Sequence, residues 1–312
     1  MISAQLKGRH FLRVNDWSAQ ELTMVLDLAD RLKARQRERV PHHHLEGRSL
    51  GMIFQKPSTR TRVSFEVGMA QLGGTALYLA AGDLQLGRGE TVKDTAKVLS
   101  RYLDGIMIRT YEQAEVDELA EHADIPVING LTDQFHPCQA LADVMTIRER
   151  FESFEGVRVA YLGDGNNVCN SLMVACAKLG MDFIAATPAG YEPSEAVVGW
   201  ARAAAGEAGT AVSLTTDPRE AAEGADVLYT DVWTSMGQDE ERERRLQDLR
   251  GFGIDSALLD LGSDRVVVMH CLPAHYGEEI AEDVLYGNRS AVWDQAENRL
   301  HAQKALLALI VR

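Results

Sequence analysis

Residues 52–62 of the chain read MIFQKPSTRTR, and this stretch predicts a strand, a loop and the start of a helix. The apolar run at 52–54 is typical of a buried strand, and Ser58 can cap a helix that stops at Gly73-Gly74. At the helix start, free backbone N–H groups, hydroxyls and a guanidinium converge on one point, which favours a bound phosphate. The order differs from GxxxxGK[ST], which argues against a nucleotide P-loop.

Strands and helices alternate on both sides of this stretch. Ser18 and Glu21 can form a capping box for an early helix, and a further helix is expected at 91–103. Further strands are expected at 105–109, 126–128, 157–162, 183–187, 212–214, 227–232 and 266–271. The alternation predicts an α/β fold with two doubly wound parallel-sheet domains joined by helices. We expect the domains at 1–150 and 151–290, with a C-terminal helix at 291–312 that packs back on the first domain.

Composition narrows the class of protein. A chain of 312 residues exceeds the usual single-core size, and 46% hydrophobic with 25% charged residues fits an ordinary globular protein. The net charge of −14 argues against a nucleic-acid or acidic-membrane surface. The four cysteines form no CxxC pair, and neither a signal peptide nor a membrane-spanning run is evident. We therefore expect a cytoplasmic protein.

Polar residues at strand ends and helix starts are the candidate site residues of the first half. Arg109 ends a strand, where open α/β sheets bind ligands, although a surface ion pair is an equal alternative. His136 and Gln139 lie on one helical turn and can polarise a carbonyl oxygen together, although a lone histidine is more often structural. Arg62 could form an ion pair with Glu66, one turn further along the helix, instead of binding an anion.

The second half begins with a glycine-rich turn, GDGNN at 163–167, between a strand and a helix. A dinucleotide fingerprint would need a third glycine, but position 168 is valine, and the next strand ends at Thr187-Pro188 rather than at an acid. Asp231 ends another strand and suits an ammonium group, but a turn or cap role is as good an interpretation. Cys271 also ends a strand, and by itself it fits an inert buried cysteine better.

Four motifs in one order resemble the aspartate and ornithine carbamoyltransferase family: STRTR at 58–62, HPCQ at 136–139, DVWTSMG at 231–237 and HCLPA at 270–274. With QLGR at 85–88 and ENR at 297–299, the resemblance covers about residues 50 to 300. The Ser-Met-Gly and His-Cys-Leu-Pro elements are those of the ornithine branch.

The resemblance implies transfer of the carbamoyl group of carbamoyl phosphate to the δ-amine of L-ornithine, giving L-citrulline and phosphate in arginine biosynthesis. It implies no metal and no cofactor, and a homotrimer in which Gln85 enters a neighbouring subunit's site. Arg109, His136 and Cys271 are the implied catalytic residues. The implied carbamoyl-phosphate-binding residues are Ser58, Thr59, Arg60, Thr61, Gln85, Arg109, His136, Gln139, Cys271, Leu272 and Arg299. The implied ornithine-binding residues are Asn167, Asp231, Ser235 and Met236.

Other functions stay open at this point. A related transferase could use another amine such as putrescine or acetylated ornithine, although the Ser-Met-Gly element at 235–237 argues against both. An NAD-linked oxidoreductase built on the second domain and a non-catalytic amino-acid-binding module are alternatives of other classes. The histidine run at 42–44 has no helical or strand spacing to a carboxylate, so we expect a loop there rather than a metal site.

Overall fold

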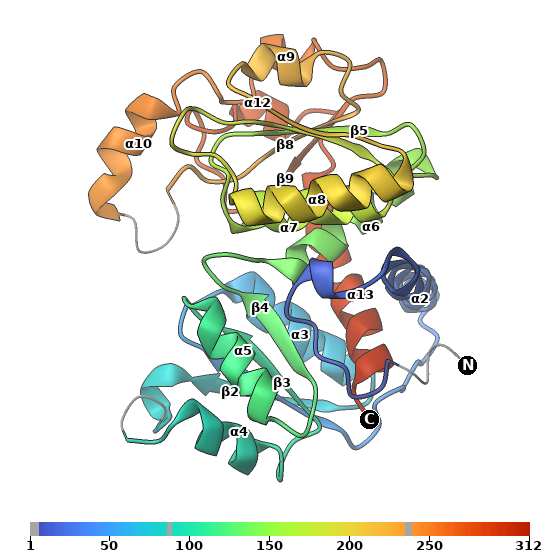
Figure 1. The fold of residues 1–312 in the computed structure, drawn as a ribbon. Coiled ribbons are helices and arrows are strands. Elements are labelled where there is room, and N and C mark those ends of the chain that lie inside the picture. Colours follow the sequence, from blue (N-terminus) through green and yellow to red (C-terminus); the bar gives the residue numbers. More distant parts are fainter. Residues whose placement is uncertain (1–5, 86–88, 235–238) are drawn as a thin grey trace. The chain divides into compact units, whose positions relative to one another are not determined.

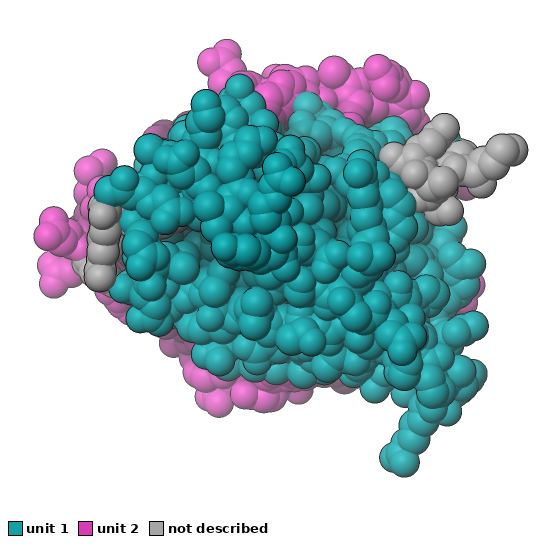
Figure 2. All heavy atoms as spheres, turned by 90° about the horizontal axis from the view of Figure 1, so that it is seen from below, with its two compact units in different colours: residues 1–141, 299–312 teal, residues 142–298 magenta. Residues whose placement is uncertain are grey.

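A computed structural model describes residues 6–85, 89–234 and 239–312. The chain forms two compact units: unit 1 contains residues 1–141 and 299–312, and unit 2 contains residues 142–298 (Figure 2). The divisions fall inside two helices, α6 (Pro137–Phe151) and α13 (Val292–Ile310), so each helix contributes residues to both units. The domain boundaries at 150 and 290 stay a prediction.

Unit 1 is built on a four-stranded parallel sheet in the order β2-β1-β3-β4 (Figure 1). The strands are β1 (Ser49–Phe54), β2 (Thr75–Ala80), β3 (Gly105–Arg109) and β4 (Val127–Leu131). The helices are α2 (Ala19–Arg37), α3 (Thr59–Gln71), α4 (Val92–Leu99) and α5 (Gln113–His122). The strands β1, β3 and β4 are buried almost throughout, as expected for a parallel sheet covered on both faces.

The strand β2 was not predicted from the sequence. It pairs with β1 from Ser49↔Thr75 to Phe54↔Ala80 and forms the edge of the sheet. Its residues are exposed or half-buried, so it has neither the continuous apolar run of a central strand nor a clean alternation of apolar and polar residues. An edge strand of this kind leaves no strong local pattern.

Unit 2 is built on a five-stranded parallel sheet in the order β7-β6-β5-β8-β9. The strands are β5 (Arg158–Leu162), β6 (Asp182–Ala186), β7 (Val212–Thr215), β8 (Val227–Thr230) and β9 (Val267–His270). The helices are α7 (Asn167–Lys178), α8 (Glu195–Ala208), α9 (Pro218–Ala222), α10 (Arg242–Asp248), α11 (Ser256–Leu259) and α12 (Glu282–Leu285). Strand order reverses beside β5, so the turn after β5 lies at a switch point, where such sheets bind ligands. The predicted fold class is confirmed.

The last part of the chain belongs to the core of unit 1. In α13, Lys304 is fully buried and contacts Gln71 Oε1 at 2.8 Å and His42 Nε2 at 3.1 Å. Burial lowers the pKa of Lys304 to about 8. His42 belongs to the histidine run, which is a loop as predicted. Within the described ranges, no helix is both long enough and apolar enough to cross a membrane.

Candidate active site

The turn that joins β1 to α3 is closed by a side-chain cap at the start of the helix. Ser58 is the N-cap of α3, and its Oγ accepts a hydrogen bond from the Thr61 N–H at 3.2 Å. The first turn of α3, which the structure describes completely, contains no acidic residue. Thr59 and Arg60 are exposed at this turn. The positive end of the helix and the Arg60 guanidinium therefore suit an anion.

The second arginine of the same motif has a different role. Arg62 Nε donates to Glu66 Oε1 at 2.9 Å, and its guanidinium lies 4.0 Å from the centre of the Tyr78 ring. Both side chains of the ion pair are more than one-third exposed, at 48% and 37%. The pairing with Glu66 that the sequence offered as an alternative is confirmed, so the two arginines of the motif do different things.

The buried guanidinium of Arg299 contacts two other predicted site residues of unit 1. Arg299 Nη1 donates to Gln139 Oε1 at 2.6 Å, and Arg299 Nη2 donates to Thr61 Oγ1 at 3.2 Å. All three side chains are buried. They come from α13, α6 and α3, which are separated by up to 238 residues in the chain. Arg299 therefore fixes Thr61 and Gln139 relative to one another, in addition to supplying a positive charge.

His136 lies in the field of three guanidiniums. Burial lowers its pKa well below the usual value, and the charges of Arg299, Arg109 and Arg60 lower it further. The imidazole is therefore neutral at neutral pH and can donate one hydrogen bond to a carbonyl oxygen. Negative charge that develops on such an oxygen would be stabilised by the same arginines.

Two further residues of unit 1, Cys138 and Gln85, belong to the HPCQ and QLGR motifs. Burial raises the pKa of Cys138 to about 12, and its Sγ donates to the Asn129 carbonyl at 3.4 Å, so this thiol is a structural group. Gln85 is exposed and follows a short 3-10 helix, Ala81–Asp83. Its predicted role toward a neighbouring subunit stays a prediction.

In unit 2, two strand ends bring a carboxylate and a thiol together. Asp231 follows β8 and Cys271 follows β9, its neighbour in the sheet. The Cys271 Sγ donates to Asp231 Oδ1 at 2.8 Å. Asp231 is buried and Cys271 is half-buried. Asn167, the other described residue of the predicted ornithine site, is the first residue of α7 and is half-buried.

The turn after Cys271 is fixed by a buried histidine. The Leu272 N–H donates to His270 Nδ1 at 2.8 Å, so the ring proton lies on Nε2, which faces Glu279 Oε1 at 3.1 Å. Leu272 adopts a left-handed backbone conformation, with φ of 60°. His270 thus stabilises the conformation of the predicted Cys271-Leu272 segment.

The glycine-rich turn after β5 has a packing explanation. Gly165 N–H donates to the Tyr191 carbonyl at 2.8 Å, and a Cβ at position 165 would lie only 2.3 Å from the Pro193 nitrogen. A glycine is required here because another backbone segment approaches closely. The dinucleotide-like appearance of the turn therefore follows from packing, and no phosphate needs to be invoked.

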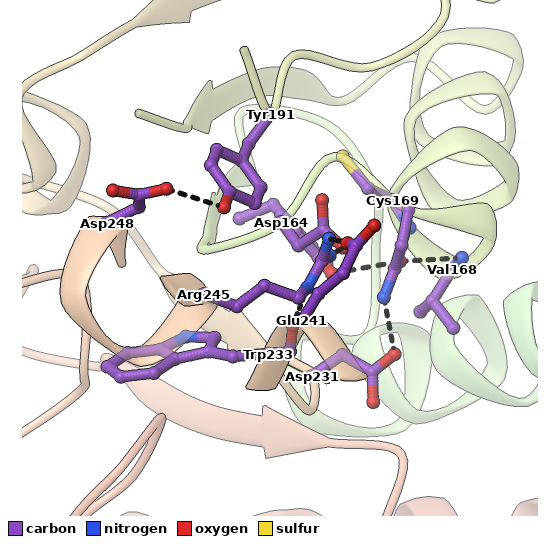
Figure 3. Close-up of polar contacts among 11 residues, drawn as sticks. Asp164, Val168, Cys169, Tyr191, Asp231, Trp233, Glu241, Arg245 and Asp248 are labelled. Carbon is purple, nitrogen blue, oxygen red and sulfur yellow. Dashed lines mark hydrogen bonds and ion pairs between the residues drawn. The ribbon is translucent and has the colours of Figure 1, made fainter. Parts of the chain in front are cut away.

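Asp164 of the same turn forms a largely buried ion pair with Arg245 of α10, in which the Asp164 side chain is 13% exposed (Figure 3). Arg245 also donates to the Trp233 carbonyl at 2.6 Å, and its guanidinium lies 5.0 Å from the centre of the Tyr191 ring. Burial raises the pKa of Asp164 to about 6, although the Arg245 charge opposes this shift. A cavity of about 400 Å³ lies beside this cluster, lined by residues 188–191 and by Glu241, Arg244, Arg245 and Asp248. Sequence reasoning did not find the Asp164–Arg245 pair.

Two predicted ornithine-binding residues, Ser235 and Met236, lie outside the described residues. Sequence reasoning also missed Asn166, the N-cap of α7, whose Nδ2 donates to Asp231 Oδ2 at 2.8 Å. An asparagine just before a helix is a recognisable cap signal, but a cap signal does not reveal a second contact to another strand.

Among the described residues, two groups of side chains have donor atoms close enough to hold a metal ion. They are Asp231, His270 and Cys271, and His275, Glu278 and Glu279. In the first group the thiol already donates to Asp231, and both ring nitrogens of His270 face protein partners. An ion would have to displace these contacts, so a resident metal fits this arrangement poorly.

Comparisons with known proteins match the two halves of the chain to two different binding domains. A family model described as the carbamoyl-P binding domain of aspartate/ornithine carbamoyltransferase matches residues 9–149, and the Asp/Orn binding domain matches residues 155–310. The chain is 56% identical over 306 residues to a protein named ornithine carbamoyltransferase from Pyrococcus abyssi, covering 98% of this chain and 96% of that protein.

Solved structures give the same result. The ornithine carbamoyltransferase from Pyrococcus furiosus matches with a TM-score of 0.96 and 56% identity over 98% of both chains. The anabolic ornithine carbamoyltransferase from Campylobacter jejuni matches with a TM-score of 0.90 and 38% identity, covering 96% of this chain and 97% of that one. On these sequence and structural grounds, the chain belongs to the aspartate/ornithine carbamoyltransferase family.

Proposed function

We propose that the chain is an ornithine carbamoyltransferase, which transfers the carbamoyl group of carbamoyl phosphate to the δ-amine of L-ornithine and releases L-citrulline and phosphate. One observation carries the proposal: a neutral, buried His136 lies in the field of Arg60, Arg109 and Arg299. Such a group can donate to a carbonyl oxygen while the guanidiniums balance a phosphate and the developing oxyanion.

Carbamoyl phosphate is bound by unit 1 in this proposal. The N–H groups and hydroxyls of Ser58 and Thr59, with Arg60 and Arg109, hold the phosphate. Thr61, Arg109, His136 and Gln139 surround the carbonyl oxygen. Arg299 supports this arrangement because it donates to both Thr61 and Gln139. The assignments of Gln85, Cys271 and Leu272 to this substrate belong to the same proposal.

Ornithine is bound by unit 2. The Asp231 carboxylate suits the α-ammonium, and the Asn167 amide suits the α-carboxylate. Ser235 and Met236 are assigned to the same amino acid by the resemblance. The Cys271 thiol lies beside Asp231, and we assign it the orientation of the δ-amine.

The reaction joins the δ-amine to an already activated acyl donor. The neutral amine attacks the carbonyl carbon, a C–N bond forms, and the oxyanion of the tetrahedral intermediate is stabilised by unit 1. The intermediate then collapses, the C–O bond to phosphate breaks, and the nitrogen loses its extra proton. Because phosphate is a good leaving group, positioning and charge stabilisation suffice, and we expect neither a metal nor a nucleotide to take part. A free aliphatic amine has a pKa of roughly 10.4, so the site has to favour its neutral form.

We further propose a homotrimer in the cytoplasm that works in arginine biosynthesis. Unit 1 exposes apolar side chains on α3, where Val63 is 50% exposed, and on the edge strand β2, where Leu77 is 45% exposed. Such residues suit a subunit interface. All four cysteines lie in described ranges and are free thiols, as is usual in a reducing compartment. The synthetic direction agrees with solved and curated relatives named anabolic.

Product stoichiometry tests the proposed activity. The purified chain, given carbamoyl phosphate and L-ornithine, should form citrulline and phosphate in equal amounts without any nucleotide. Phosphate release without citrulline would show simple hydrolysis, and that outcome would contradict the proposal.

A further inference from the structure

Asn166 occupies a place in unit 2 that the proposed function does not use. It is the N-cap of α7 and directly precedes Asn167. Its Oδ1 accepts hydrogen bonds from the Val168 N–H at 2.9 Å and the Cys169 N–H at 3.2 Å. Capping alone would explain this contact, but serine or aspartate would cap the helix equally well.

The amide nitrogen of Asn166 has a partner that capping does not require. Nδ2 donates to Asp231 Oδ2 at 2.8 Å. The oxygen of the same amide also accepts from the Tyr161 hydroxyl at 3.1 Å, so three donors face it. The partners therefore fix the orientation of the amide, and its nitrogen has to face the carboxylate. Serine has only one short hydroxyl, whose oxygen is needed for the cap, and an ionised aspartate has no donor.

The Asp231 carboxylate is consequently held on both sides. One oxygen accepts from Asn166 and the other from the Cys271 thiol at 2.8 Å. Asp231 is only 6% exposed, so water competes weakly for these bonds. The three residues follow β5, β8 and β9, which are neighbours in the sheet with aligned carboxyl ends.

We propose that Asn166 is a positioning residue, whose amide nitrogen fixes the Asp231 carboxylate between the first turn of α7 and the Cys271 thiol. The inference rests on the proposed function, in which Asn167 and Asp231 hold the amino-acid end of ornithine and Cys271 orients its δ-amine. Asn166 then sets the distance between the group that binds the α-ammonium and the group that faces the reacting amine. It does not itself touch the reacting atoms.

Two substitutions separate positioning from capping. Asn166→Ser keeps a good cap but removes the donor to Asp231, and Asn166→Asp keeps a good cap but places a second carboxylate against Asp231. A residue that only caps the helix would tolerate both. A positioning residue predicts that kcat/KM for ornithine falls at least about tenfold in the serine variant and further in the aspartate variant, because like charges repel. The KM for carbamoyl phosphate should stay within about twofold.

Alkylation of Cys271 supplies a readout that does not depend on turnover. The thiolate reacts with iodoacetamide, and a carboxylate that accepts the S–H bond disfavours the thiolate. In Asn166→Ser the carboxylate loses its anchor, so alkylation of Cys271, followed by mass spectrometry, should be several-fold faster than in the unchanged chain. Asp217→Ala is the matched control, because it removes the N-cap of α9 in the same unit. It should lower the melting temperature slightly and leave both readouts unchanged.

Each outcome has one meaning. An ornithine-specific loss in the order aspartate then serine, with faster alkylation, supports the inference. Ornithine kinetics within about twofold of the unchanged chain in both variants, equal losses for both substrates, or unaltered alkylation would overturn it. If the unchanged chain forms no citrulline, the proposed function fails by itself. The alkylation rates still decide whether Asn166 holds Asp231 against Cys271.

Discussion

Replacing Arg60 by glutamine should weaken the binding of carbamoyl phosphate, whereas the same change at Arg62 should not. Arg60 is exposed in the first turn of α3, where we propose that the phosphate binds. Loss of one charge-assisted hydrogen bond costs about 1.5–3 kcal/mol, which corresponds to roughly 10- to 150-fold in affinity. Arg62 is paired with Glu66 on an exposed surface, and such a pair contributes at most about 1 kcal/mol to stability.

The two arginines make a sharp comparison because they lie two residues apart on one helix. Initial rates at saturating ornithine give the KM for carbamoyl phosphate, and calorimetric titration with carbamoyl phosphate measures binding without turnover. Arg60→Gln should raise both the KM and the dissociation constant by at least about tenfold, and Arg62→Gln should leave both within about twofold. Equal effects of the two substitutions, or unchanged binding in Arg60→Gln, would refute the assignment of the phosphate to this turn.

The remaining predictions concern the thiol, the histidine, the buried ion pair and metals. Cys271→Ser replaces the thiol that we assign to orienting the δ-amine, so kcat should fall while the KM for carbamoyl phosphate changes little; normal turnover would return Cys271 to an inert role. The pKa of His136 is lowered in the folded chain, so below about pH 6.5 the unfolded chain takes up a proton first, and stability falls by up to about 1.4 kcal/mol per pH unit from this group. Urea unfolding of His136→Gln should therefore show a weaker loss of stability in acid than the unchanged chain, and identical pH dependence would contradict this. Arg245→Met leaves Asp164 buried without its ion-pair partner and should cost about 3 kcal/mol of stability, whereas Arg244→Met, whose side chain is 81% exposed, should change it by less than about 0.5 kcal/mol. Exhaustive chelation should leave turnover unchanged. Activity that is lost on chelation and restored by zinc would show that histidines and cysteines of the chain bind a metal ion that the reaction needs.

Local patterns in the sequence predicted most of the fold. The apolar runs of β3 and β5 and the cap at Ser58 are signals that depend only on neighbouring residues, and their elements lie within a residue or two of the expected bounds. The strand β2 was missed because an exposed edge strand lacks such a pattern. The helix expected at 91–103 ends at Leu99, since residues 100–103 turn toward β3 instead.

The contacts that organise the candidate site could not be predicted in the same way. The sequence predicted Arg109, His136 and Asp231 as site residues because they lie at strand ends or at a helix start. However, the Arg299–Thr61 bond joins residues 238 positions apart, and the Asn166–Asp231 bond joins residues 65 positions apart. Such pairings depend on which helices and strands become neighbours in the folded chain, and a single sequence does not encode this locally. The neutral state of His136 likewise follows from burial and from arginines on other elements.

The identity of the acceptor amine distinguishes an ornithine carbamoyltransferase from a related transferase, and one set of rates measures it. Citrulline or the corresponding carbamoylated product should be measured from carbamoyl phosphate with ornithine, putrescine, lysine, N-acetylornithine and aspartate under the same conditions. A site that hydrogen-bonds both the α-ammonium and the α-carboxylate rejects amines that lack either group. The kcat/KM for ornithine should therefore exceed that for putrescine and for N-acetylornithine by at least about 100-fold. Lysine is one methylene longer and aspartate has no side-chain amine, so both should also react more slowly than ornithine. An equal or higher kcat/KM for any of the other four amines would contradict the account.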